Sequence, residues 1–274
     1  MFTKARFFSF LLLLFSLAVD GQAGAEEQTR LTITGSSTVA PLVSEIAKRY
    51  EREHGNIRID VQTGGSSRGL ADVRRGLSDI GMMSRALGSD GSDLDAFTIA
   101  SDGIALITHA DNPVERIASD GIRAIYLGEA TNWSRFGGAD RDIVVINKAA
   151  GRATLDVFLQ HFQLDDRQIK AQIIAGENQQ VIKTVAGNPA AIGYVSIGAA
   201  VEESRLGVPI RMLGFDDVMP APANVVNGSY PITRPLQLIV RSGSSDDVMA
   251  FIRYSQSAAV RDLVEGARFV YMQN

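Results

Sequence analysis

The chain lacks cysteine altogether and holds only three histidines in 274 residues. Without thiols, a disulfide framework, a thiolate metal site and a lipid attached to an N-terminal cysteine are all excluded. His54, His109 and His161 lie far apart, with no pair at i, i+4 spacing, so a histidine-based zinc site is not expected either. We therefore expect no metal ion in the functional site.

Positive charge and nucleotide motifs are also scarce. The chain has 27 Lys and Arg against 31 Asp and Glu, a net charge of −4. This balance does not favour a nucleic acid partner, although it permits a local site for one small anion. Neither a Walker lysine motif nor a G-x-G-x-x-G motif is present, so no cofactor is expected.

The one long apolar run lies near the start of the chain, at residues 7–19. Lys4 and Arg6 precede it and Ala23-Gly24-Ala25 follows it, a pattern typical of a signal peptide over residues 1–25. No later stretch approaches the roughly 18 apolar residues that a membrane helix needs. We expect a mature chain that starts at Glu26, is exported to the periplasm and has no membrane anchor.

One local pattern occurs three times: an extended segment, a loop rich in Gly or hydroxyl residues, and an amphipathic helix. The segments with their loops span residues 32–38, 61–67 and 144–154. A helix N-terminus offers unpaired N–H groups and about half a positive charge, and Ser or Thr hydroxyls add donors. Three such loops predict an oxyanion site contacted from several sides, although each Ser or Thr alone is also a common helix cap.

Hydrophobic periodicity predicts strands and helices that alternate along the chain. The expected strands are residues 31–34, 57–61, 79–85, 102–107, 143–147, 191–195 and 235–240. The expected helices are residues 41–50, 119–127, 154–162 and 245–264, with one more marked by Leu70, Val73 and Leu77. Ser37 or Thr38 is expected to cap the first helix. This alternation implies parallel sheets covered by helices, an α/β fold.

Short motifs follow one another along nearly the whole chain after residue 26. They are Gly35-Ser36-Ser37-Thr38-Val39-Ala40-Pro41, Gly64-Gly65-Ser66-Ser67-Arg68-Gly69, Asp79-Ile80-Gly81, Asp102-Gly103-Ile104-Ala105, Asn132-Trp133, Gly193-Tyr194 and a stretch from Asn224-Val225 to Tyr230-Pro231-Ile232. In this order the motifs resemble those of the phosphate-binding proteins of ABC importers.

The resemblance implies a two-lobed periplasmic binding protein fold of type II. Each lobe would be a mostly parallel sheet flanked by helices, with the ligand cleft between the lobes. Lobe 1 is expected over residues 26–107 and 232–274, and lobe 2 over residues 108–231. The resemblance further implies a monomeric binding protein, not an enzyme, that captures inorganic phosphate and delivers it to the membrane permease of an ABC importer.

The same resemblance suggests which residues bind the ligand. In the third loop the family usually has an arginine where this chain has Lys148, and Arg152 can supply the bidentate fork that a lysine lacks. The predicted ligand-binding set is Ser36, Ser37, Thr38, Ser66, Ser67, Arg68, Ser84, Arg85, Asp102, Lys148, Gly151, Arg152, Ala153 and Thr154.

Several members of this set have a second interpretation. Ser84 stands where the family tends to place an Asp that accepts a proton from hydrogen phosphate. Because a serine both donates and accepts, it discriminates less against a fully deprotonated anion, so a carrier or sensor for another oxyanion such as sulfate stays open. Arg68 and Arg85 are equally compatible with solvated surface charges, and Asp102 with a turn cap or a partner that orients an arginine.

An enzymatic interpretation starts from the second loop. Gly65-Ser66-Ser67-Arg68-Gly69 fits the G-x-S-x-G elbow of serine hydrolases, with Ser67 as nucleophile and His109 or His161 as base. The strand before this loop is polar at alternate positions, whereas an elbow follows a buried central strand. We therefore interpret the loop as an anion loop.

Overall fold

The computed structural model describes residues 28–272, so the predicted signal peptide lies outside the described residues. The strands are β1 (Thr29–Gly35), β2 (Ile57–Thr63), β3 (Ile80–Met83), β4 (Leu94–His109), β5 (Val144–Lys148), β6 (Ile173–Ala175), β7 (Ala191–Ser196), β8 (Ile210–Leu213) and β9 (Thr233–Arg241). The helices are α1 (Ala40–Glu53), α2 (Ser66–Arg74), α3 (Ser119–Tyr126), α4 (Ala153–Phe162), α5 (Asn178–Ala186), α6 (Ile197–Arg205), α7 (Pro222–Val226), α8 (Asp246–Ser255) and α9 (Arg261–Gly266). Within this part of the chain, no helix combines the length and the apolar character needed to cross a bilayer.

The strands form one mixed sheet in the order β2-β1-β3-β9-β4-β7-β5-β6, with β8 paired to β4. Strand β1 is parallel to β2 and β3, and β5 is parallel to β6 and β7. The long strands β4 and β9 run antiparallel to each other and to their outer neighbours β7 and β3. The predicted α/β fold is thus confirmed, with parallel pairing at each end of the sheet and an antiparallel pair at its centre.

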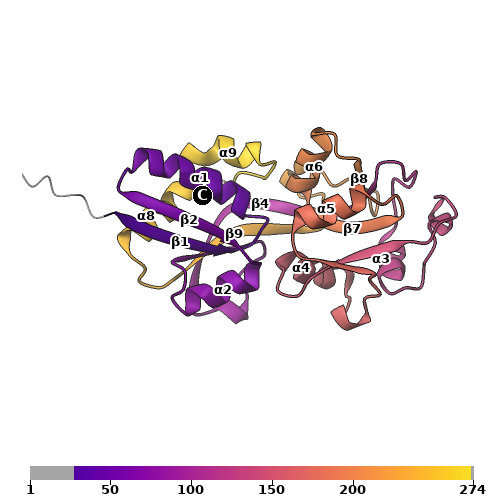
Figure 1. Cartoon of the computed structure of the whole chain (residues 1–274), viewed down its shortest axis with the longest axis horizontal. Coiled ribbons are helices and arrows are strands. Elements are labelled where there is room, and N and C mark those ends of the chain that lie inside the picture. Colours follow the sequence, from indigo (N-terminus) through magenta and orange to yellow (C-terminus); the bar gives the residue numbers. More distant parts are fainter. Residues whose placement is uncertain (1–27, 273–274) are drawn as a thin grey trace, which may run out of the picture.

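Strands β4 and β9 cross between two lobes, which lie side by side in Figure 1. Below, lobe 1 denotes β1–β3 with α1, α2, α8 and α9, and lobe 2 denotes β5–β8 with α3–α7. Each lobe has its own apolar core, around Ile33 and Phe251 in lobe 1 and around Tyr126 and Phe158 in lobe 2. The predicted lobe boundary at 107/108 falls inside β4, and the one at 231/232 falls just before β9. Both boundaries therefore lie on the strands that connect the lobes, and their exact positions stay a prediction.

Helix α1 shows how the predicted periodicity becomes packing. Its predicted apolar residues Leu42, Val43, Ile46, Ala47 and Tyr50 are all buried in the lobe 1 core. Burying each larger member of this set stabilises the fold by about 1.5–3 kcal/mol. The predicted cap is wrong: the N-cap is Val39, whose side chain has no capping group. The Thr38 side chain makes no capping hydrogen bond and instead lines a cavity between the lobes.

The C-terminal helix predicted at residues 245–264 is two helices, α8 and α9, separated by a 3-10 turn at Ala258–Val260. The Ser257 hydroxyl accepts a hydrogen bond from the Ala259 N–H and so starts the new turn. Both helices pack against α1, which returns the chain to lobe 1 (Figure 1). Helix α2 ends at Arg74, and Leu77, predicted as part of its apolar face, is 64% exposed.

Candidate anion-binding site

A small polar cavity lies where the two lobes meet. Its lining residues are Ser36, Ser37, Thr38, Gly65, Ser66 and Ser84 from lobe 1, and Lys148, Arg152, Ala153, Thr154, Gly176 and Asn178 from lobe 2. Its volume of about 10 Å³ leaves room for about one water molecule. The lobes are therefore closed around a set of polar groups that bond to one another.

Three helices begin at this cavity. The first residue of α2 is Ser66, α4 starts at Ala153, α5 starts at Asn178, and all three residues line the cavity. Because helix N-termini carry partial positive charge and unpaired N–H groups, their convergence favours a bound anion. The sequence pattern predicts the α2 and α4 termini, whereas α5 joins them only in the folded chain.

Glycine permits the loops of the two lobes to touch. Gly65 has φ of +96°, and a Cβ at this position would lie 2.7 Å from the Gly151 carbonyl oxygen. Any larger residue would be strained and would push the loops apart. Beside this contact the Ser67 N–H donates to the same Gly151 oxygen at 3.2 Å.

The hydroxyl groups of lobe 1 form a connected network. Ser36 Oγ donates to Ser84 Oγ at 2.9 Å and accepts from the Thr38 N–H at 3.2 Å. The Ser84 N–H donates to Ser66 Oγ at 3.3 Å. All four residues are buried. The network holds these hydroxyls at fixed positions around the cavity, where they can donate to the oxygens of a bound anion.

A buried arginine on β9 connects the two lobes behind the cavity. Arg234 Nη2 and Nε lie 2.8 and 3.2 Å from Asp102 Oδ2, and both side chains are almost fully buried. The same guanidinium donates to Thr154 Oγ1 at 2.8 Å and to Thr38 Oγ1 and Ser84 Oγ at 3.4 Å each. Because Arg234 and Asp102 lie on the crossing strands, this ion pair fixes a positive charge between the lobes.

Comparison with known proteins assigns the family. A family model described as "PBP superfamily domain" matches residues 20–259. The chain belongs to the PBP superfamily.

Its relatives share both sequence and fold. The chain is 29% identical over 247 residues to "Phosphate-binding protein PstS" of Bacillus subtilis, a match that covers 88% of this chain and 80% of the relative. A Clostridium perfringens structure with bound phosphate, described as a candidate phosphate ABC transporter substrate-binding protein, is 30% identical with a TM-score of 0.83 and is covered completely by 89% of this chain. An ABC-type phosphate transport receptor from Vibrio cholerae is 27% identical with a TM-score of 0.73, again over 89% of this chain and all of the other. These matches confirm the resemblance to phosphate-binding proteins and the two-lobed fold.

Within this PBP fold, lobe 2 supplies two basic side chains to the cavity lining. Arg152 Nη1 lies 2.6 Å from Glu177 Oε1, and the Glu177 side chain also caps α5. Lys148 is 2% exposed, and its Nζ donates to Asn178 Oδ1 at 3.0 Å. Burial, and then the nearby Arg234 charge, lower the pKa of Lys148 to about 7. Together with Arg234 these side chains place three cations around one small cavity.

The structure places nine of the predicted site residues directly on the cavity. The nine are Ser36, Ser37, Thr38, Ser66, Ser84, Lys148, Arg152, Ala153 and Thr154. Gly151 contacts the opposite loop, and Asp102 reaches the cavity only through Arg234. Whether these residues bind the ligand stays a prediction.

Besides Gly151 and Asp102, three more predicted residues lie outside the cavity lining. Ser67 is exposed, and Arg68 is exposed and pairs with Asp72 at 3.1 Å. Arg85 forms ion pairs with Asp90 of lobe 1 and Asp156 of α4. Arg85 therefore bridges the lobes beside the cavity, and we remove all three residues from the proposed contact set.

The serine hydrolase interpretation finds no support in the geometry. Within residues 28–272, no histidine forms a hydrogen bond with Ser67. His109 Nδ1 accepts from the Asp111 N–H instead, and His161 packs against Phe215. The described residues also contain no group of three or more His, Asp and Glu side chains placed to hold a metal ion.

Sequence reasoning missed Arg234, Asn178, Gly65 and Gly176. Arg234 has a sequence signal, since a charged residue inside the apolar strand Thr233–Arg241 must find a buried partner. Asn178 has none of its own, because its neighbours predict only the start of a helix.

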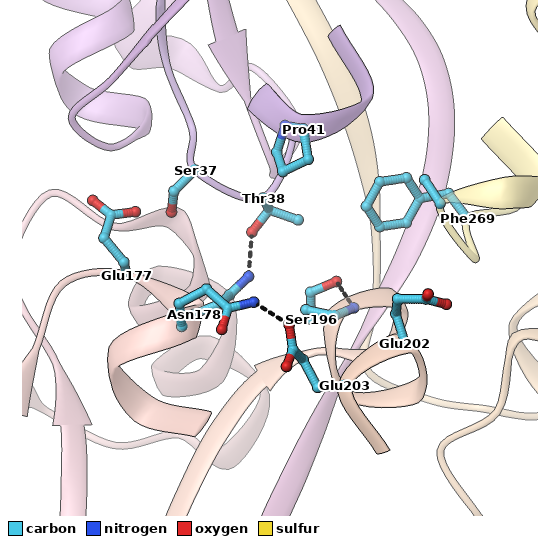
Figure 2. A pocket seen from close by; sticks show the side chains of 13 residues that line it. Ser37, Thr38, Pro41, Glu177, Asn178, Ser196, Glu202, Glu203 and Phe269 are labelled. Atoms are coloured by element: carbon cyan, nitrogen blue, oxygen red, sulfur yellow. Dashed lines mark hydrogen bonds between the residues drawn. The ribbon is translucent and has the colours of Figure 1, made fainter. Parts of the chain in front are cut away.

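A second, larger pocket lies on the other side of Thr38 and Asn178, which line both hollows (Figure 2). The Asn178 Nδ2 group donates to Thr38 Oγ1 at 3.2 Å, across the lobes. This hydrogen bond forms part of the wall between the pocket and the anion cavity. Phe269 and three glutamates, Glu177, Glu202 and Glu203, line the larger pocket, which makes it a poor site for an anion.

Proposed function

We propose that this chain is an extracytoplasmic solute-binding protein that captures inorganic phosphate between its lobes and delivers it to the permease of an ABC importer. The observation that carries the proposal is Arg234. Its guanidinium is held by Asp102 and directed at Thr38, Ser84 and Thr154, three hydroxyl residues that line the cavity from both lobes. A tetrahedral oxyanion is the ligand class that matches such a fixed fork surrounded by donors.

Capture requires the lobes to separate and close again. The cavity of about 10 Å³ is too small for phosphate, so the polar groups that now bond to each other must part to admit it. Strands β4 and β9 are the connections that can bend during this motion. In the closed complex the phosphate oxygens replace the bonds between Arg234, the hydroxyls and Asn178. Micromolar affinity corresponds to about −8.2 kcal/mol, which several charge-assisted hydrogen bonds of roughly 1.5–3 kcal/mol each can supply.

The names of the relatives support this assignment. The Bacillus subtilis relative is named a phosphate-binding protein, and the Clostridium perfringens structure holds phosphate. The export, the permease partner and the monomeric state belong to the same proposal, as does the absence of catalysis.

Another oxyanion is the second candidate. Of the described residues, no Asp or Glu lines the anion cavity, so hydroxyls and the Asn178 side chain are the acceptors available to a protonated ligand oxygen. A cavity without a carboxylate repels a fully deprotonated anion less strongly. Sulfate therefore serves as the comparison ligand.

The test is calorimetric titration of the mature chain after unfolding and refolding in phosphate-free buffer, which strips any ligand acquired during expression. We expect one phosphate per chain and weaker binding of sulfate. Tighter binding of sulfate would move the assignment to the second candidate. Binding of neither anion by protein with native circular dichroism would overturn the proposed function.

A further inference from the structure

The charges around the anion cavity are unevenly paired. Arg234 pairs with Asp102, and Arg152 pairs with Glu177. Lys148 is the exception: within residues 28–272, no carboxylate lies within ion-pair distance of its Nζ. Its polar partner is the neutral amide oxygen of Asn178, although the lysine is 2% exposed. Burying an ammonium group without a counter-charge costs free energy, so the lysine is the unbalanced charge of the site.

The groups packed around Lys148 do not supply this balance. From β9 the Arg234 charge, and from the start of α4 the Arg152 charge, both oppose a charged lysine, whereas Glu177 at the start of α5 favours one. On β7 the Tyr194 hydroxyl accepts from the Lys148 backbone N–H at 3.3 Å, and burial raises the pKa of this phenol so that it stays neutral. The result, dominated by burial, is a lysine pKa of about 7.

We propose that Lys148 takes up a proton when the site binds its anion, so that the ligand provides the counter-charge that the chain withholds. This inference rests on the proposed function, because it assigns a role to one residue of the same site. A bound oxyanion within reach of Nζ favours the ammonium form, which returns the lysine to full charge. Lys148 thus selects ligands by charge: a dianion compensates both the new ammonium and the cationic surroundings, whereas a neutral ligand compensates neither.

The sign of the pH dependence follows from this linkage. Above the pKa of Lys148 in the absence of anion, the lysine is mostly neutral before binding and carries one more proton after binding. Affinity must then fall as the pH rises, by up to about tenfold per pH unit. Phosphate is mostly a dianion at about pH 8. A site that binds the dianion therefore loses no affinity above this pH through titration of phosphate itself, and Lys148→Met separates this case from selective binding of the monoanion.

The decisive experiment measures the number of protons bound per anion. Phosphate is titrated by calorimetry at about pH 8 in two buffers of different ionisation enthalpy, with the wild-type chain, Lys148→Met and the matched control Lys170→Met, whose lysine is exposed and outside the cavity. We expect the wild type and Lys170→Met to take up close to one proton more per phosphate than Lys148→Met. Equal uptake in all three proteins would overturn the proposal.

A second measurement covers the case in which Lys148→Met binds too weakly to titrate. The phosphate affinity of the wild type is then compared at about pH 8 and pH 9, where we expect a loss of close to tenfold. An unchanged affinity would overturn the role of Lys148 and leave the phosphate carrier intact. If phosphate does not bind at all, the proposed function fails. The same titrations with sulfate, which does not change its charge in this pH range, then show whether Lys148 takes up a proton on anion binding. Binding of neither anion would overturn both.

Discussion

The two walls of the anion cavity are built from different chemistry. Lobe 1 contributes neutral hydroxyls held in one network, centred on Ser36, Ser66 and Ser84. Lobe 2 contributes the basic side chains of Lys148 and Arg152, of which Arg152 carries a permanent charge. Arg234 stands between the walls on a strand that belongs to both.

The difference suggests that lobe 2 attracts the anion and lobe 1 orients it. Charges act over distances of about 8–10 Å in physiological salt, so the lobe 2 wall can attract an anion before the cavity closes. Hydroxyls act only at hydrogen-bond distance and in fixed directions, so the lobe 1 wall can orient the anion once it has arrived. Variants on the two walls should therefore differ in both size of effect and dependence on salt.

The largest effect should come from Arg234→Met, which removes the charge shared by both walls. The variant leaves the Asp102 carboxylate buried without a partner, so we expect the free energy of unfolding to fall by about 3–5 kcal/mol in urea titrations. Phosphate binding should weaken by at least about 100-fold in calorimetry, or about 2.8 kcal/mol. Arg211→Met, at an exposed pair with Glu115, is the matched control and should change neither quantity.

A double variant separates stability from binding. Asp102→Asn combined with Arg234→Met removes both charges of the buried pair, and we expect it to recover part of the lost stability without recovering phosphate affinity. Wild-type affinity in either Arg234 variant would contradict the central position given to this residue.

Arg152→Ala tests the cationic wall of lobe 2. We expect phosphate affinity to fall by at least about tenfold, because a charge-assisted hydrogen bond contributes roughly 1.5–3 kcal/mol. The dependence of affinity on salt should also become weaker, as measured by calorimetry at two ionic strengths. Arg68→Ala is the control, since this exposed side chain pairs with Asp72 away from the cavity. Similar losses in the two variants would argue against the contact set proposed here.

Ser66→Ala tests the neutral wall of lobe 1. Loss of one neutral hydrogen bond costs about 0.5–1.5 kcal/mol, so affinity should fall by roughly two- to tenfold. The salt dependence should stay that of the wild type, in contrast to Arg152→Ala. The neighbouring Ser67→Ala is a matched control, because Ser67 is exposed and outside the cavity lining. A larger effect at Ser67 than at Ser66 would reopen the hydrolase interpretation.

The smallest effect should come from Arg85→Met, which removes an ion pair between the lobes beside the cavity. Partly exposed ion pairs contribute about 0.2–1 kcal/mol, so we expect no more than roughly a fivefold change in phosphate affinity. The change would come from a shift in the equilibrium between the open and closed forms. Arg74→Met, which breaks a pair with Asp93 inside lobe 1, should leave affinity unchanged in the same titrations. A loss as large as that of Arg152→Ala would place Arg85 back among the ligand contacts.

The loops of the site could be predicted from sequence because their geometry is local. Ser36 to Thr38 lie between β1 and α1, and Ser66 follows β2 as the first residue of α2, so their position at a helix start is fixed by neighbours along the chain. The prediction of a single helix at residues 245–264 was wrong because a local capping group interrupts it. Its apolar spacing continues across Ser255 and Ser257, while the hydroxyl of Ser257 starts a new turn.

The sequence by itself determined the α/β alternation, the buried face of α1 and the loops that meet at the cavity, because each depends on residues within a few turns or strands of one another. Only the tertiary structure decided that Arg234 pairs with Asp102, 132 positions away, and that Asn178 meets Thr38, 140 positions away. It also decided that Lys148 is buried with no carboxylate of residues 28–272 within ion-pair distance of its Nζ. Pairings over such distances depend on how β4 and β9 cross between the lobes, and this crossing leaves no periodic pattern in the sequence from which it could be read.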